Sequence, residues 1–371
     1  MVSPKPANRG LRLLGKPHVR PAILWEELKD REGWVKCNLC ARRCIIAPGR
    51  YGVCGVRKNI DGKLYTVVYG LLTAMNIDPI EKKPLYHYHP GSRVLSVSTV
   101  GCNFFCKFCQ NWSISQSRLE KGLYGVFKTP EEVVSAALEY DADGISYTYN
   151  EPTIFFEFMY DTAKLAKDNG LFNTMVTNGY ITSEAVDMLG NLMDAATVDF
   201  KGGGNPDFYK KYSGVLNPEH IFEAILAMRD NGWFIEITNL VVPEVGDHED
   251  DIRKLSGWIV DNIGPETPFH LLRFHPDYKM LDFPPTPLAT LEKLAKVAME
   301  EGLKHVYIGN VAPHPLEHTY CPKCGYRVIE RIGFSIVSWK LKEDNTCPKC
   351  GYKLNIKGTY HGRGHDYLFL L

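Results

Sequence analysis

Apolar and polar positions alternate regularly through the middle of the chain, and this pattern predicts a series of short strands. The strands are expected at residues 94–99, 144–149, 173–177, 196–200, 234–242, 270–274 and 305–309. Helix start signals lie between them, for example Thr129 followed by Pro130 and two glutamates, and a similar design ahead of residues 221–229. A capping side chain, a first-turn proline and first-turn acids all favour a helix N-terminus.

Strands that alternate with helices indicate parallel βα units. About seven such units predict an α/β fold with a full or partial (β/α) barrel. A doubly wound open sheet is the alternative.

Composition divides the chain into three predicted parts. Residues 1–92 form an N-terminal cysteine-rich segment, with a β-rich run at 63–74. Residues 93–312 form the barrel. From residue 313 to 371 the chain is rich in proline, histidine and paired cysteines, which predicts a small C-terminal domain.

Charge and hydropathy exclude several classes of function. The 371 residues include 44% hydrophobic and 23% charged residues, as in an ordinary globular protein. Lys plus Arg (43) equals Asp plus Glu (43), which argues against bulk attraction to nucleic acid or anionic membranes. No apolar run is long enough for a membrane span, and residues 1–20 lack a secretory signal. We therefore expect a cytoplasmic protein.

The 11 cysteines carry the most information, because an odd count in such a chain argues against a disulfide framework and for metal sites. They fall into groups of four, three and four: Cys37, Cys40, Cys44 and Cys54; Cys102, Cys106 and Cys109; Cys321, Cys324, Cys347 and Cys350. Four thiolates close a tetrahedral site or hold every iron of a cubane, whereas three leave one iron open. The arithmetic predicts two closed sites and one open site, and we expect chemistry at the open one.

The last group belongs to a short internal repeat. Cys321-Pro-Lys-Cys-Gly-Tyr-Arg returns as Cys347-Pro-Lys-Cys-Gly-Tyr-Lys, with a 22-residue spacer between Cys324 and Cys347. Each half supplies two ligands from a tight turn whose glycine tolerates a positive φ. We predict a zinc ribbon with a structural Zn²⁺. The alternative is a partner-binding or nucleic-acid-binding role, since the segment from Cys321 to Tyr367 contains nine Lys or Arg but only four Asp or Glu.

The group of three follows directly after the predicted strand at 94–99. In a βα barrel this position is at the C-terminal face, where active sites lie. Spacings of three and two residues let one loop bind three corners of a cubane. Zinc is the alternative, but the neighbouring Gln110 and Asn111 are poor ligands.

The run Cys102-x3-Cys106-x2-Cys109, with Phe108 before the last cysteine, resembles the radical S-adenosylmethionine (SAM) superfamily. It is most similar to the branch related to pyruvate formate-lyase activating enzymes. Residues 78–87 and 101–103 resemble the AmmeMemoRadiSam-system radical SAM proteins. The resemblance implies a [4Fe-4S] cluster on the three cysteines, with SAM bound to the fourth iron.

In that family an electron from the reduced cluster cleaves SAM to methionine and a 5′-deoxyadenosyl radical, which abstracts a hydrogen from a substrate. The resemblance therefore implies an enzyme that needs an electron donor. Its substrate is either a glycyl-radical protein to be activated or another protein or metabolite to be modified. A non-catalytic zinc protein is the alternative of a different class.

The resemblance also suggests cofactor-binding residues besides Phe108. Glu151 matches a residue near the SAM amine, and the alternative is an acid at a helix N-terminus. Asn178 lies in a Thr-Asn-Gly turn of the family, although Val176 replaces an aspartate common in activating enzymes. Asp199 and Lys201 resemble an Asp-x-Lys pair whose ammonium meets the SAM carboxylate; a simple salt bridge is the alternative. His275 matches a histidine near SAM, and a surface or core histidine is the alternative.

The first group, from Cys37 to Cys54, lies in a compact segment with several turns. It resembles the cysteine segment that precedes the barrel in AmmeMemoRadiSam-type proteins. Soft thiolates accept either zinc or a second iron–sulfur cluster, so the spacing leaves both open.

Overall fold

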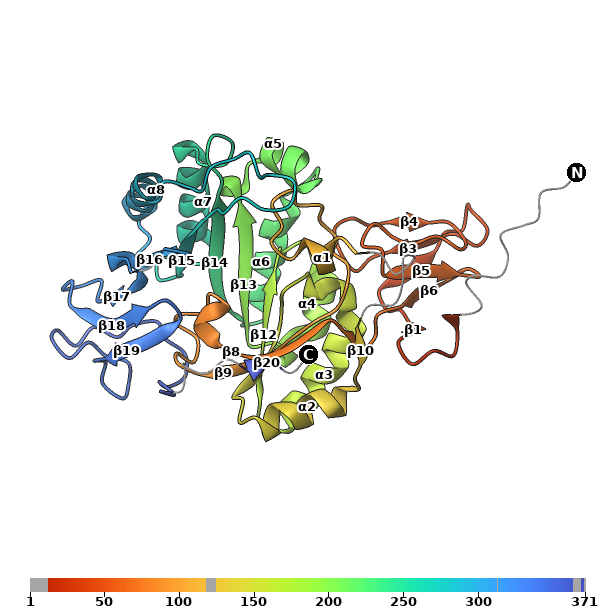
Figure 1. Ribbon diagram of the computed structural model, residues 1–371, viewed down its shortest axis with the longest axis horizontal. Helices are drawn as coiled ribbons and strands as arrows, with labels where there is room; N and C mark the ends of the chain where they lie inside the picture. Colours follow the sequence, from red (N-terminus) through yellow and green to blue (C-terminus); the bar gives the residue numbers. More distant parts are fainter. Residues whose placement is uncertain (1–12, 118–124, 312, 363–367, 370–371) are drawn as a thin grey trace, which may run out of the picture.

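The computed structural model describes residues 13–117, 125–311, 313–362 and 368–369. A nine-stranded sheet runs through its middle, in the order β16-β15-β14-β13-β12-β11-β9-β8-β20 (Figure 1). Its strands are β8 (Ala74–Pro79), β9 (Arg93–Ser98), β11 (Gly144–Tyr147), β12 (Phe172–Thr177), β13 (Ala195–Lys201), β14 (Phe234–Val241), β15 (Phe269–Arg273), β16 (Val306–Gly309) and β20 (Leu368–Phe369).

Within this sheet, β9 and the strands from β11 to β16 are all parallel. β8 pairs antiparallel with β9 on one side and with the edge strand β20 on the other. Each parallel strand lies within two residues of a predicted one. Their spatial order follows the chain without reversal, whereas a doubly wound sheet reverses its order at a switch point. The α/β prediction with a partial barrel is therefore confirmed, and the alternative of a doubly wound sheet is excluded.

The helices connect the parallel strands: α1 (Trp112–Ser115), α2 (Pro130–Glu139), α3 (Phe156–Asp168), α4 (Ser183–Leu189), α5 (Pro206–Phe208), α6 (His220–Asp230), α7 (Glu249–Asn262) and α8 (Leu288–Glu300). The predicted signal before α2 is a complete capping box: Thr129 accepts from Glu132 N–H, and the Glu132 carboxylate accepts from Thr129 N–H. Among the described helices, none has the length and apolar character needed to span a bilayer.

The N-terminal part contains short antiparallel strands at one end of the molecule's long axis (Figure 1). They are β1 (Arg20–Pro21), β2 (Trp25–Glu27), β3 (Val35–Cys37), β4 (Ile45–Ile46), β5 (Arg57–Ile60), β6 (Lys63–Thr66) and β7 (Leu71–Leu72), the last of which pairs with β10 (Val126–Phe127). The predicted β-rich run at 63–74 corresponds to β6 and β7.

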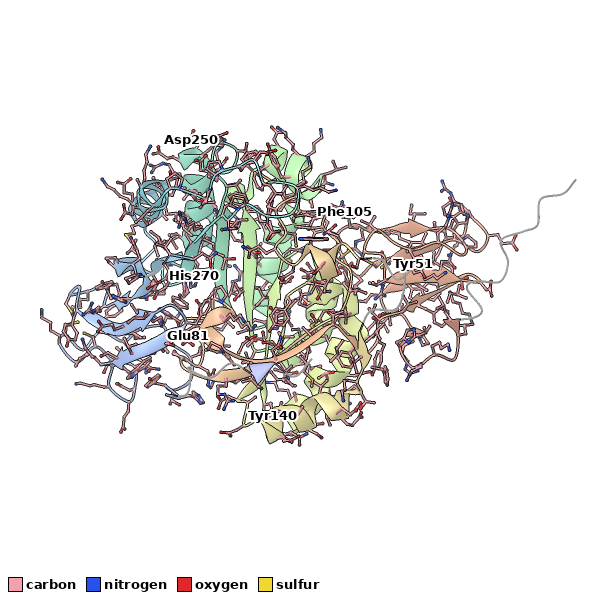
Figure 2. The ribbon with its side chains drawn as sticks, viewed as in Figure 1. Tyr51, Glu81, Phe105, Tyr140, Asp250 and His270 are labelled. Carbon is pink, nitrogen blue, oxygen red and sulfur yellow. The ribbon has the colours of Figure 1, made fainter. Side chains whose placement is uncertain are left out.

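The C-terminal sheet of β17 (Thr319–Tyr320), β18 (Arg327–Ile332) and β19 (Ser335–Trp339) lies at the opposite end of the long axis (Figure 1). It packs on the barrel through Arg331, a fully buried side chain. The Arg331 guanidinium donates to Tyr86 O at 3.0 Å and lies 4.3 Å from the centre of the Tyr86 ring. Figure 2 shows Glu81 and His270 on this side of the sheet. The main sheet thus takes strands from all three predicted parts, and the division at residues 92 and 312 stays a prediction.

Candidate active site

Three thiols lie on one loop at the carboxyl end of β9, between that strand and α1: Cys102, Cys106 and Cys109. Local hydrogen bonds hold the loop in place. The Phe104 N–H donates to Cys102 Sγ at 3.4 Å, and Cys109 Sγ lies 3.2 Å from the hydroxyl of Ser115 in α1. A loop tied to a strand end and a helix presents the thiols in a defined arrangement.

The donor set fits an iron–sulfur cluster with an open iron. Burial raises the pKa of the Cys106 thiol to about 11, and burial with the nearby Glu151 carboxylate raises the pKa of Cys102. Binding to a metal cation offsets this effect, because the cation stabilises the thiolate form. Within the described part of the chain, no fourth Cys, His, Asp or Glu forms a compact ligand group with them.

A cavity of about 520 Å³ opens beside the loop, within the usual range for small-molecule and cofactor sites. It is lined by the three thiols and by every residue that the resemblance suggested for the cofactor: Phe108, Glu151, Asn178, Asp199, Lys201 and His275. These residues lie at or after the carboxyl ends of different strands, and the parallel sheet brings those ends to the same edge.

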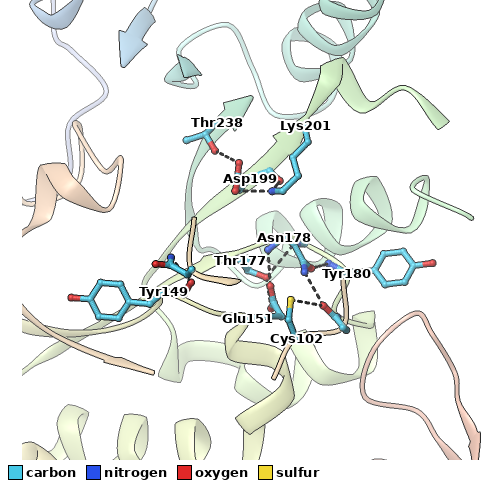
Figure 3. A network of polar contacts seen from close by, with 12 residues as sticks. Cys102, Tyr149, Glu151, Thr177, Asn178, Tyr180, Asp199, Lys201 and Thr238 are labelled. Atoms are coloured by element: carbon cyan, nitrogen blue, oxygen red, sulfur yellow. Dashed lines mark hydrogen bonds and ion pairs between the residues drawn. The ribbon is translucent and has the colours of Figure 1, made fainter. Parts of the chain in front are cut away.

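The Glu151 carboxylate connects the segment after β11 to the end of β12 (Figure 3). Its Oε1 accepts from the Thr153 N–H at 3.1 Å and the Thr153 hydroxyl at 2.6 Å, and from the Thr177 hydroxyl at 2.8 Å. Its Oε2 accepts from Asn178 N–H at 2.8 Å. Burial raises the pKa of the Glu151 carboxyl, and these donors oppose that effect. Glu151 caps the 3₁₀ helix η4 (Pro152–Phe155), as its alternative role predicted, and also lines the cavity.

Asn178 connects the end of β12 to the cysteine loop. Its Nδ2 donates to Asn103 Oδ1 at 2.7 Å, and its Oδ1 accepts from Tyr180 N–H at 3.0 Å. The following Gly179 has a φ of +72°, and a Cβ there would lie 2.7 Å from Ile221 Cγ2. The Thr-Asn-Gly turn thus needs glycine at its third position.

Asp199 and Lys201 lie on one face of β13, as strand alternation predicted (Figure 3). Lys201 Nζ lies 2.7 Å from Asp199 Oδ2, and Asp199 Oδ1 accepts from the Thr238 hydroxyl at 3.0 Å. Burial lowers the pKa of Lys201, but the negative charges of Asp199 and Cys106 outweigh it and raise that pKa. The ammonium is therefore charged at the wall of the cavity.

Phe108 and His275 occupy opposite environments. Phe108 is buried, with its ring centre 5.8 Å from that of Phe208. His275 is exposed, and its Nδ1 lies 2.9 Å from Pro276 O. Phe108 thus belongs to the floor of the cavity and His275 to its rim.

Sequence reasoning missed a buried group that reaches the cavity from β8 and the residues after it. Lys83 Nζ lies 2.6 Å from Asp78 Oδ2, and the hydroxyl of Tyr149 donates to the same oxygen. Lys82, Lys83 and Tyr149 all line the cavity. Burial lowers the pKa of Lys83 to about 8. The sequence carries no signal for this group, because the burial of Lys83 arises from packing between distant segments.

The two remaining cysteine groups are also assembled. In the C-terminal domain, Sγ atoms lie 3.5 Å apart for Cys321 and Cys350 and 3.8 Å apart for Cys324 and Cys347, and all four lie within 4.8 Å of one another. The glycines of both turns have the predicted positive φ. This geometry is compatible with a zinc ribbon. The N-terminal group of four lines one small cavity.

Comparison with known proteins agrees with this geometry. A sequence model of the radical SAM superfamily matches residues 96–255. The chain is 48% identical over 318 residues to the uncharacterized protein MJ0808 of Methanocaldococcus jannaschii, covering 85% of this chain and 93% of that protein. It is 26% identical over 237 residues to the pyruvate formate-lyase-activating enzyme of Clostridium pasteurianum, covering 58% of this chain and 92% of that enzyme.

A solved domain of a pyruvate-formate lyase-activating enzyme from Bacteroides vulgatus aligns with a TM-score of 0.40 at 19% identity, covering 46% of this chain and 100% of that one. The chain belongs to the radical SAM superfamily, whose members use SAM and a [4Fe-4S] cluster. Its homology to pyruvate formate-lyase activating enzymes confirms the resemblance seen in the sequence.

Proposed function

We propose that this chain is a radical SAM enzyme with its [4Fe-4S] cluster on Cys102, Cys106 and Cys109. SAM would bind in the adjoining cavity. The observation that carries the proposal is the cavity of about 520 Å³, which the three thiols share with six side chains suggested independently from the sequence. When bound, the reduced cluster and SAM supply a 5′-deoxyadenosyl radical that abstracts a hydrogen from the substrate.

Lys201 and Glu151 suit the two charged groups of the methionine part of SAM. The Lys201 ammonium binds its carboxylate, and Asp199 orients that ammonium through the 2.7 Å ion pair. Among the described residues, Glu151 Oε2 accepts one hydrogen bond, from Asn178 N–H. Because a carboxylate oxygen accepts two, the amino group of SAM can donate the second.

Phe108, Asn178 and His275 have supporting roles. Phe108 covers the floor of the cavity and excludes water from the thiols. Asn178 fixes the cysteine loop relative to β12 through Asn103. His275, at the exposed rim, contacts the nucleoside of SAM or the incoming substrate.

A glycyl-radical protein is the substrate class we favour. Curated relatives include a pyruvate formate-lyase-activating enzyme, and the homology extends over more than half of this chain. The cavity rim also carries a surface suited to a polypeptide. Trp112 follows the cavity-lining Asn111, is 45% exposed and stacks on Tyr278 with ring centres 5.3 Å apart. Exposed aromatic side chains are common anchors for protein partners.

Electron paramagnetic resonance of the anaerobically prepared, dithionite-reduced protein tests the proposal. SAM binding at an open iron should change the spectrum of the reduced cluster. Cys106→Ala should abolish the change, while Cys324→Ser, in the distant C-terminal domain, should retain it. A fully iron-loaded protein whose spectrum does not respond to SAM would contradict the proposal and favour the non-catalytic alternative.

A further inference from the structure

The four N-terminal cysteines surround a shared space next to the barrel. Cys37, Cys40, Cys44 and Cys54 line one cavity together with Arg57 and Ile154, the latter in η4 of the barrel. The cavity has a volume of about 10 Å³, which is close to the size of one water-sized sphere. The four thiols therefore face one common space, where a single metal centre can bind all of them.

The spacing of the sulfurs separates this group from the C-terminal one. Four thiolates around one zinc lie roughly 3.8 Å apart, given a bond length of about 2.3 Å and tetrahedral geometry. The C-terminal sulfurs match this spacing, with pairs at 3.5 and 3.8 Å. Within the described chain, no three of the N-terminal sulfurs all lie within 4.8 Å of one another. The same is true of the three sulfurs of the cysteine loop. Thiolates on a cubane are spread in this way because each binds a different iron.

Arg57 supplies an unused donor to this cavity. The side chain is 2% exposed; its Nη1 lies 2.8 Å from Glu157 Oε1, and its Nη2 donates to Ile23 O at 2.6 Å. Its Nε–H is buried and has no hydrogen-bond partner among the residues that the structure describes. Leaving a buried donor unpaired is unfavourable, so its position against four thiols points to a sulfur acceptor that is present when the site is loaded. N–H donors to cluster sulfur tune the reduction potential.

The N-terminal cysteines also lie against the loop that carries Cys102. Gly101 has a φ of +95°, and a Cβ there would lie 2.8 Å from the carbonyl oxygen of Cys54. Arg42, between Cys40 and Cys44 in the chain, donates from Nε to Asn103 O at 2.9 Å. Figure 2 shows Phe105 of the loop at the junction with the N-terminal strands, whereas the C-terminal domain lies at the far end of the molecule. The N-terminal cysteine group is thus packed directly against the loop that carries the other three thiols.

We propose that Cys37, Cys40, Cys44 and Cys54 hold a second [4Fe-4S] cluster that relays electrons to the cluster on the cysteine loop, an inference that rests on the proposed function of that loop. A low-potential one-electron donor of the ferredoxin or flavodoxin class reduces the second cluster from 2+ to 1+. That cluster returns to 2+ as it passes the electron to the loop cluster, which goes from 2+ to 1+. No bond forms or breaks in this transfer.

Metal analysis and Mössbauer spectroscopy of the full chain, reconstituted anaerobically with ⁵⁷Fe, test the proposal without relying on activity. The wild type should hold about eight irons, and the Cys102→Ala/Cys106→Ala/Cys109→Ala variant about four, in a [4Fe-4S] spectrum. Zinc should stay near one per chain in both, bound by the C-terminal cysteines. Cys324→Ser is the matched control and should lower zinc without changing iron.

A second zinc per chain, or no iron in the triple variant, would overturn the second cluster. Cys37→Ala and Cys54→Ala provide a second check, because each should reduce iron to about four per chain while the loop cluster remains. If either variant keeps about eight irons, the assignment of ligands is wrong. The proposed function fails separately, by the absence of a SAM-dependent spectral change in a protein that retains both clusters.

Discussion

Replacing Lys201 with methionine removes the ammonium that we assign to the carboxylate of SAM. In the structure this group lies 2.7 Å from Asp199 Oδ2 and lines the cavity. A hydrogen bond to a charged partner contributes about 1.5–3 kcal/mol, so its loss should weaken SAM binding roughly 10- to 150-fold. Folding should suffer less, because the Asp199 side chain is 34% exposed and remains hydrated when it loses its partner.

The assay is equilibrium binding of SAM to the anaerobically reconstituted variant, with its iron content measured on the same sample. Lys210→Met is the matched control, since Lys210 is exposed in the segment after β13 and does not line the cavity. Lys210→Met should leave the Kd unchanged. If Lys201→Met also binds SAM within about twofold of the wild type at full iron loading, Lys201 serves only its ion pair, and the assignment is refuted.

Three further predictions follow from the site. Glu151→Gln places an amide NH₂ among the donors from Thr153, Thr177 and Asn178, so at least one buried hydrogen bond is lost. Urea denaturation should show a decrease of about 1–3 kcal/mol in the free energy of unfolding, and an unchanged value would contradict this network. Arg57→Lys keeps the buried charge but removes the Nε–H at the N-terminal cysteines, so spectroelectrochemistry should find a lower midpoint potential for the second cluster alone, with iron content unchanged. Burial opposes ionisation of Asp78, yet Lys83, Lys82 and Tyr149 hold its pKa at about 2. Because this folded-state pKa lies below the ordinary value, the ionised Asp78 stabilises the fold above about pH 4. This contribution, about 2 kcal/mol, is lost as the pH falls toward 2. Thermal melts of metal-free protein should therefore depend less on pH between 5 and 3 in Asp78→Asn than in the wild type, and parallel curves would contradict the assignment.

Much of the fold was predictable because its signals are local. Alternation of apolar residues set the seven parallel strands, and caps such as Thr129 set the helix starts. Strand β8 and its antiparallel partner β20, the edge strand, were not predicted. β20 has only two residues, and its pairing with β8 joins segments nearly 300 residues apart in the sequence.

The candidate site was likewise only partly predictable from the sequence. Each cysteine group and each residue at a strand end, such as Glu151 and Lys201, follows from spacing, resemblance and the shared edge of a parallel sheet. Lys83 could not be placed, because its position in the cavity depends on burial against Asp78 and Tyr149 from two different strands. The role of Arg57 could not be predicted either, since only the packed structure shows that its Nε–H has no partner among the described residues.

The most direct test of the central claim is the formation of 5′-deoxyadenosine from SAM by anaerobic, iron-loaded, dithionite-reduced protein, measured by liquid chromatography and mass spectrometry. The wild type and Cys324→Ser should both form 5′-deoxyadenosine and methionine in equal amounts. The Cys102→Ala/Cys106→Ala/Cys109→Ala variant should form neither product. Absence of both products from wild-type protein whose loop cluster is filled and reduced would contradict the assignment of this chain as a radical SAM enzyme.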